Sequence, residues 1–202
     1  MKRQHGFRQT QLILLFSLLL ATTVCAADRP NVLFIAVDDL RPEFDCYDVP
    51  KMITPNLNRL ARRGVQFDRA YCNIAVCGAS RASIMKGLRP TPTRFTSYLT
   101  RADEDAPDVP SLPFVLKKNG YHTVSNGKVY HHRNDDRAAW SEPAWGPPKS
   151  SIWWALPENR PVKGTKNRGP AYEWADVPDG EYPDHMICDK SLNDMRRLAK
   201  GD

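Results

Sequence analysis

Three pairs of residues have the types and spacing that chemistry on an anionic substrate requires. Adjacent carboxylates can bind a hard cation, a cysteine followed by an arginine can combine a nucleophile with an anion-binding group, and a lysine followed by a histidine can supply positive charge and a proton. The pairs are Asp38 with Asp39, Cys77 with Arg81, and Lys128 with His131. Each pair also has an ordinary structural explanation, so its context has to decide.

The acidic pair follows the segment Asn31 to Val37, which is apolar and rich in β-branched residues. Such a run is typical of a strand buried on both faces. Asp38 and Asp39 would then lie at the carboxyl end of that strand and give a calcium ion two of the roughly six to eight oxygen ligands that it takes. The alternative is that the pair only ends the strand and caps the next turn.

Cys77 is predicted to lie at the N-terminus of a helix. The stretch Ser80 to Lys86 is compatible with a helix, and Gly87 is a stop signal. A cysteine at a helix N-terminus is favoured as an anion, and Arg81 lies one turn along on the same helical face. The alternative is a small buried cysteine beside a surface arginine.

Lys128 and His131 follow the segment Tyr121 to Ser125, which alternates like a short strand. At a strand end, the two residues would offer cationic or proton-donating groups to an anion. The alternative is that His131 and its neighbour His132 are only surface residues.

The remaining elements that must position these residues also alternate between helix and strand. Thr54 as N-cap and Gly64 as stop indicate a helix, Val65 to Tyr71 alternates like a strand, and Ser111 to Asn119 is a predicted helix. This order predicts an α/β fold. A last predicted helix follows Tyr182. Its proposed apolar face consists of Met186, Leu192, Met195 and Leu198.

Residues 140–183 have a different character, because all five tryptophans and many prolines and glycines fall there without sustained periodicity. The pattern predicts a long irregular excursion. Such an excursion either lines a binding site or packs its aromatic residues onto its own domain.

Residues 1–26 have the pattern of a signal peptide, which leaves 27–202 as the exported chain. The apolar run Leu12 to Val24 is shorter than the roughly 20 residues that span a bilayer, so no stable membrane association is expected. A membrane anchor and a lipid-modified Cys25 are the alternatives. The basic residues before the run are Lys2, Arg3 and Arg8.

Charge and cysteine content restrict the function further. The formal net charge is +6, and three of these charges lie in the predicted signal peptide, so the exported chain retains only +3 and nucleic-acid binding is not indicated. An oxidising compartment would permit disulfides among the four remaining cysteines. These are Cys46, Cys72, Cys77 and Cys188.

Five short motifs occur in order along the chain. They are Val37-Asp38-Asp39-Leu40-Arg41-Pro42, Val76-Cys77-Gly78-Ala79-Ser80-Arg81-Ala82-Ser83, Gly87-Leu88-Arg89-Pro90, Asn119-Gly120-Tyr121 and Gly127-Lys128-Val129-Tyr130-His131. Together they resemble the type I, formylglycine-dependent sulfatase family, most closely its iduronate-2-sulfatase group. The similarity runs from about Pro30 to Pro90 and from Pro110 to His132, and returns weakly near Asp184.

The resemblance implies an alkaline-phosphatase-like α/β fold, in which helices flank a central mixed sheet and this chain is the N-terminal part. It implies that a formylglycine-generating enzyme converts Cys77 to formylglycine, whose hydrate attacks the sulfur of a sulfated sugar or a glycosaminoglycan-like polysaccharide. Asp38, Asp39 and the modified Cys77 would bind calcium. By the same resemblance, Arg81 would align the hydrate, Lys128 would contact the sulfate and His131 would position the nucleophile.

Two substitutions and one larger difference separate the chain from the family pattern. Ala79 replaces the commoner proline, and Lys86 stands where a threonine is usual. No match is found for the further metal ligands, the histidine and the lysine that the family's second half supplies. The chain is therefore interpreted as a fragment, a truncated gene product or a decayed copy, and these 202 residues alone are not expected to hydrolyse a sulfate ester. The alternatives are a phosphonate or phosphodiester hydrolase of the same superfamily and a non-catalytic remnant.

Overall fold

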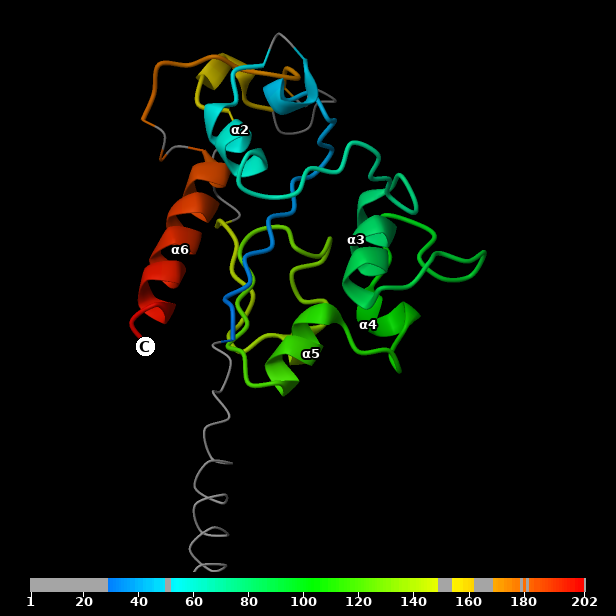
Figure 1. The fold of residues 1–202 in the computed structure, drawn as a ribbon. Coiled ribbons are helices and arrows are strands. Elements are labelled where there is room, and N and C mark those ends of the chain that lie inside the picture. Colours follow the sequence, from blue (N-terminus) through cyan, green and yellow to red (C-terminus); the bar gives the residue numbers. More distant parts are fainter. Residues whose placement is uncertain are drawn as a thin grey trace, which may run out of the picture. The chain divides into compact units, whose positions relative to one another are not determined.

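The computed structural model describes residues 29–49, 52–148, 154–161, 169–178, 180 and 182–201. The predicted signal peptide lies outside the described residues. Contacts divide the chain into a unit of residues 1–35 and a unit of residues 36–202, and the second unit contains every candidate site residue. Figure 1 shows its helices joined by loops. The α-helices are α2 (Pro55–Ala61), α3 (Cys77–Lys86), α4 (Ala102–Asp105), α5 (Leu112–Lys118) and α6 (Pro183–Leu198), and the 3-10 helices are η1 (Asp45–Tyr47), η2 (Arg137–Ala139) and η3 (Pro157–Asn159).

The predicted helices are present, and their ends follow the expected local signals. Gly87 ends α3 in the left-handed conformation with φ 63°, which costs a residue without a side chain little. Ser111 caps α5 because its side chain accepts a hydrogen bond from the Phe114 N–H. Thr54 precedes α2 as predicted, but its side chain does not cap the helix and instead accepts a hydrogen bond from the Asp45 N–H at 3.2 Å.

The predicted strands at 31–37, 65–71 and 121–125 are not present as strands in the described part of the chain. A strand is held by hydrogen bonds to a neighbouring strand. The sheet-like pairings among described residues are single bridges, antiparallel between Thr91 and Arg94 and parallel between Asn126 and Trp145. Val37 is 57% exposed and Phe67 is 69% exposed, so these apolar segments lack the partners that their composition anticipates. The central mixed sheet is therefore not confirmed.

The core of the second unit is small and lies on α3. Ala79, Ala82 and Met85 of that helix are buried together with Phe95 and Tyr130, and α4 contributes Ala102. Helix α3 also contacts α4 and α5, which Figure 1 shows beside it. The most buried helix thus begins at the residue that the sequence marks as the nucleophile.

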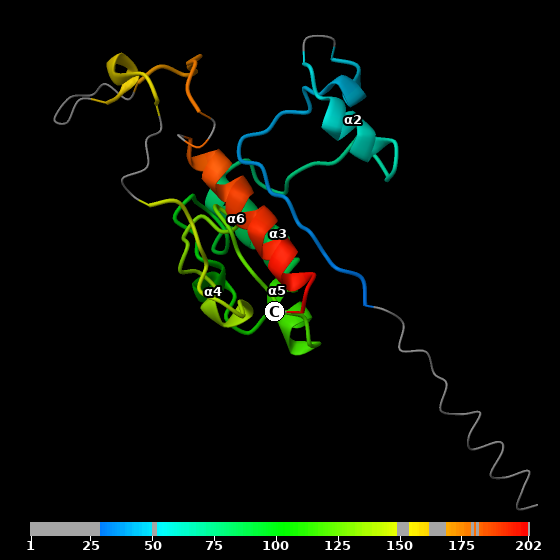
Figure 2. The same ribbon diagram turned by 90° about the vertical axis from the view of Figure 1, so that its left-hand side faces the viewer.

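Helix α6 buries the predicted apolar face only in part: Met186 and Leu198 are half-buried, but the other two residues of that face are exposed. Leu192 and Met195, assigned to the apolar face, are 38% and 39% exposed, whereas Asp194 is only 6% exposed. A buried carboxylate needs hydrogen-bonding partners, and those of Asp194 are described below. Both views show α6 as a long continuous helix (Figure 2).

Within the described ranges, no helix combines the length and the apolar character that crossing a membrane would require.

Candidate active site

Cys77 is the first residue of α3 and is half-buried. Its Sγ atom lies 3.3 Å from Nδ1 of His131, which is 54 positions later in the chain. The first N–H groups of a helix have no partner within the helix, and they carry its positive partial charge. The prediction that Cys77 begins a helix is therefore confirmed, and the side chain of residue 77 lies beside the imidazole of His131 at the positive end of that helix.

The residue after the cysteine has to be glycine. A Cβ atom on Gly78 would lie 2.1 Å from the backbone oxygen of Tyr98, which is far closer than any real contact of this kind. The loop that contains Tyr98 therefore packs directly on the first turn of α3. This contact fixes the start of the helix, and with it the position of Cys77.

Arg81 is buried, with 7% of its surface exposed, and connects α3 to two distant segments. Its Nη2 donates to Asp38 Oδ1 at 2.7 Å, and its Nη1 donates to the backbone oxygens of Lys128 and of Val129, the latter at 3.0 Å. A guanidinium has its donors in a fixed planar fork, so these three acceptors fix its orientation. Arg81 consequently holds the segments of the site in place and also contributes positive charge to it.

Asp38 pairs with two cations at once, because Lys128 Nζ donates to its second carboxylate oxygen. Burial raises the pKa of Asp38, but the hydrogen bonds from Lys128 and Arg81 outweigh burial and hold the pKa below its ordinary value. Asp38 is thus ionised at neutral pH. It holds both cations within one cluster next to α3.

His131 has a lowered pKa, first because of burial and then because of the positive charge of Lys128. The ordinary histidine pKa is about 6.5, so the ring is neutral at pH 7 and able to accept a proton. Tyr98 meets the ring edge-on with 5.7 Å between centroids, and the ring of His132 lies 4.9 Å away. These neighbours hold the imidazole beside Cys77.

Asp38 and Asp39 supply the type of ligand that calcium prefers, carboxylate oxygens, but too few of them to form a complete site. Each carboxylate oxygen has about two lone-pair sites, so Asp38 can bind a cation while it keeps its hydrogen bonds to Arg81 and Lys128. Asp39 adopts φ 53°, and no hydrogen bond or ion pair joins it to this cluster in the described ranges. The described residues include no group of three or more histidine, cysteine or acidic side chains that could hold a metal ion. The two aspartates fit only as part of a larger ligand set.

Of the predicted site residues, the structure brings Asp38, Cys77, Arg81, Lys128 and His131 together, and it leaves Asp39 outside their hydrogen-bond network. Sequence reasoning missed Tyr98, which lies in a loop that no motif marks, and it considered His132 only as a surface neighbour of His131. It also missed the role of Lys86. The Lys86 ammonium is buried and donates to the Val109 oxygen at 2.8 Å, so this unusual residue ties α3 to the loop before α5.

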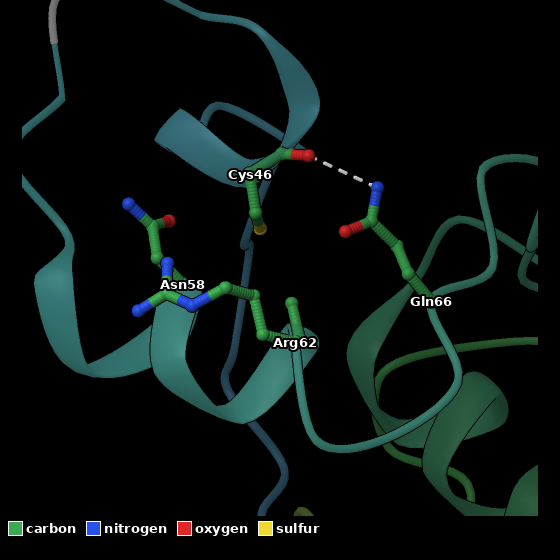
Figure 3. A pocket seen from close by; sticks show the side chains of 5 residues that line it. Cys46, Asn58, Arg62 and Gln66 are labelled. Carbon is green, nitrogen blue, oxygen red and sulfur yellow. Dashed lines mark hydrogen bonds between the residues drawn. The ribbon is translucent and has the colours of Figure 1, made fainter.

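A surface hollow lies near Cys46 and contains none of the predicted site residues. It is lined by Asn58, Arg62 and Gln66 among others, and Gln66 Nε2 donates to the Cys46 backbone oxygen at 3.0 Å (Figure 3). All four cysteines outside the predicted signal peptide are free thiols in the structure, so no disulfide forms among them. The hollow near Cys46 has no counterpart of the Cys77 and His131 pair.

Comparison with known proteins agrees with the family resemblance of the sequence motifs. The sulfatase family model matches residues 30–196. The chain is 32% identical to mouse iduronate 2-sulfatase over 86% of this chain and 33% of the relative, and 36% identical to a sulfatase of Formosa agariphila over 86% of this chain and 37% of the relative. It is 28% identical to N-acetylglucosamine-6-O-sulfatase of Bacteroides thetaiotaomicron over 85% of this chain and 28% of the relative.

The chain spans about a third of the length of these relatives. The family to which they belong has the alkaline-phosphatase-like α/β fold, and its named members here are sulfuric ester hydrolases. Because the family match extends over most of the sequence and includes the ordered cluster around Cys77, the chain belongs to the sulfatase family.

Proposed function

We propose that this chain is the N-terminal portion of the catalytic domain, residues 27–202, of an exported sulfatase that releases sulfate from a sulfated carbohydrate. The observation that supports the proposal most is the contact of His131 with Cys77 at the N-terminus of the most buried helix, beside the cluster in which Arg81 and Lys128 both donate to Asp38. A sulfate ester is anionic and gains charge on its leaving oxygen as it is cleaved. Two cations and a helix N-terminus are suited to stabilise that charge.

Each residue has a defined task in this proposal. Arg81 and Lys128 bind the anionic group, and Asp38 orients both of them through its two carboxylate oxygens. His131, neutral because its pKa is lowered, holds or accepts a proton at Nδ1, the atom that faces Cys77 Sγ. The packed loop at Tyr98 keeps residue 77 in place while bonds change.

The proposal includes two groups that the unmodified polypeptide does not itself contain, a formylglycine side chain and a calcium ion. Formylglycine, formed from Cys77 by a formylglycine-generating enzyme, would supply a hydrated aldehyde as nucleophile, with Cys77 Sγ marking where the reacting group of residue 77 lies. A calcium ion, with Asp38, Asp39 and the modified residue 77 among its ligands, would add positive charge beside the sulfate. A central mixed sheet completed by further sequence would support both.

The proposed substrate class is a sulfated sugar or a glycosaminoglycan-like polysaccharide. Two of the relatives are named for sulfate esters on sugars, iduronate and N-acetylglucosamine. A short basic cluster with one buried arginine binds the sulfate group itself and says little about the ring that carries it, so recognition of the sugar is assigned to other parts of the protein.

The test is sulfate release by the whole protein produced with a formylglycine-generating enzyme. Cys77→Ala is expected to remove at least about 1,000-fold of kcat/KM on a sulfated uronic acid or an aryl sulfate, because it removes the nucleophile. Cys72→Ala is the matched control, since Cys72 is an exposed free thiol. Mass spectrometry should find an aldehyde in place of the thiol at residue 77. Full sulfate release by the Cys77 variant, or faster hydrolysis of an aryl phosphate diester than of the sulfate, would contradict the proposal.

A further inference from the structure

We infer that Asp194 of α6 is a positioning residue for the candidate active site, because it holds the turn of residues 126–128 and so fixes Lys128 and the carbonyl groups that orient Arg81. No motif marks this residue. Its catalytic consequence rests on the proposed function, whereas its contact with the turn does not.

Asp194 is buried and satisfied by donors from two parts of the chain. Asn126 Nδ2 donates to Asp194 Oδ2 at 2.9 Å across 68 positions of sequence. Lys190 Nζ donates to the same oxygen, and Arg197 Nη2 donates to Oδ1 at 3.3 Å. Burial raises the pKa of Asp194, but the hydrogen bonds from Lys190, Asn126 and Arg197 outweigh it and lower the pKa. The carboxylate is therefore a charged, fixed acceptor for Asn126.

The turn also packs closely on α6 and is hydrogen-bonded to residue 145. Gly127 has φ 71°, and a Cβ atom there would lie 2.8 Å from Cδ1 of Ile187, also on α6. The Gly127 N–H donates to the Trp145 oxygen at 2.8 Å. The backbone of the turn is thus confined between α6 and residue 145, and it has little freedom to move without displacing the helix.

The turn leads directly into the site. Lys128, the next residue, donates to Asp38, and its backbone oxygen accepts a hydrogen bond from Arg81. A shift of the turn would therefore move one cation and reorient the other. A misplacement of about 1 Å at a positioning contact can cost on the order of 100-fold in rate, so a contact outside the site can control it.

Asp194→Ala is the test, with Asp189→Ala as the matched control on the same helix. Asp189 is 60% exposed at its side chain and pairs with His185 in the same helix. Asn126→Ala is the second variant, because it removes the same bond from the other side and leaves Asp194 with Lys190 and Arg197. Two quantities are measured well below the melting temperature of every variant: amide hydrogen exchange of residues 125–131, and kcat and KM for sulfate release.

We expect both Asp194→Ala and Asn126→Ala to speed exchange in residues 125–131 by about tenfold while exchange in α3 stays unchanged, because the turn opens more often. We expect about a tenfold loss of kcat/KM in the same variants and none with Asp189→Ala. A purely structural role would lower the melting temperature and leave kcat/KM of the folded protein unchanged, and that outcome overturns the inference. If the unaltered protein released no sulfate, the proposed function would fail, and unchanged exchange in 125–131 would separately sink the role of Asp194.

Discussion

Asp38 and Asp194 are two carboxylates with nearly the same partners and different surroundings. Each accepts hydrogen bonds from one lysine and one arginine, and each has its pKa lowered by those bonds against the effect of burial. The side chain of Asp38 is 34% exposed, whereas that of Asp194 is 8% exposed. In the proposed function, this difference in exposure separates a cluster that binds a ligand from one that holds two segments together.

The partners of each carboxylate support the same distinction. Lys128, which pairs with Asp38, is 40% exposed at its side chain, so its ammonium can turn towards a ligand. Lys190, which pairs with Asp194, lies on the same helix as its partner and closes an (i,i+4) pair. In the proposed function these similar ion pairs have different roles, and the half-buried Cys77 next to only one of them marks that pair as the candidate site.

The largest effect expected in this comparison comes from removing Arg81, the arginine of the Asp38 cluster, and the arginine of the Asp194 cluster is the control. Arg81→Ala should lower kcat for sulfate release by about 100-fold to 1,000-fold, because in the proposed function it removes a preorganised cation from the position where charge develops. Arg197→Ala removes the corresponding cation from Asp194, and Arg197 also donates to Glu142 at 2.6 Å. Its effect on kcat should be about threefold at most, since Asp194 keeps Lys190 and Asn126. Equal losses in steady-state assays of the two variants would break the comparison.

The next effect tests whether the turn before Lys128 is confined by α6. Gly127→Ala should lower the free energy of unfolding by about 2–4 kcal/mol, because it adds a clash with Ile187 to the strain of a left-handed backbone. Gly87→Ala is the matched control: Gly87 has φ 63°, and among the described residues no neighbouring atom lies within 4 Å of the place that its Cβ atom would take. That control should cost only about 1 kcal/mol, and urea unfolding measures both. Equal costs would mean that Ile187 gives way easily.

A pH titration sharpens the comparison further. The pKa of Asp194 is lowered from its ordinary value of 3.8, so its bonds contribute full stability above that value and lose their contribution as the pH falls below 3.8 through the folded-state pKa. Asp194→Asn should therefore differ from the unaltered protein by a constant free energy of unfolding between about pH 7 and pH 5, and the difference should shrink towards pH 3. Urea unfolding across this range gives the curve. A difference that grows on acidification has the wrong sign and would contradict the assigned ionisation.

The sequence predicted the helical part of the site well, because helix signals are local. The four-residue spacing of Cys77 and Arg81 places them on one face of a helix, and Gly87 ends that helix where expected. The meeting of His131 with Cys77 spans 54 positions, so spacing could not establish it. Only the resemblance to a family anticipated that contact.

The predicted strands and the burial of Asp194 show two things that local sequence patterns did not predict correctly. The apolar run at 31–37 has the composition of a buried strand, yet a strand also needs a partner, and none is present among the described residues. In α6 the apolar periodicity favoured a face with Leu192 and Met195, whereas the structure buries Asp194. An aspartate with three donors is compatible with burial, but its donor Asn126 is 68 positions away and invisible to local periodicity.

The smallest expected effect separates the contributions within the Asp194 cluster. Lys190→Ala removes an (i,i+4) pair whose lysine side chain is 28% exposed, and such pairs contribute about 0.5 kcal/mol to stability. The free energy of unfolding should fall by about that amount, with exchange in residues 125–131 unchanged, because the bond from Asn126 remains. Asp189→Ala removes the neighbouring pair with His185 and serves as the control for loss of an exposed pair. If the Lys190 variant instead opened the turn as strongly as Asn126→Ala does, Asp194 would depend on its lysine for orientation, and the two clusters would work in the same way after all.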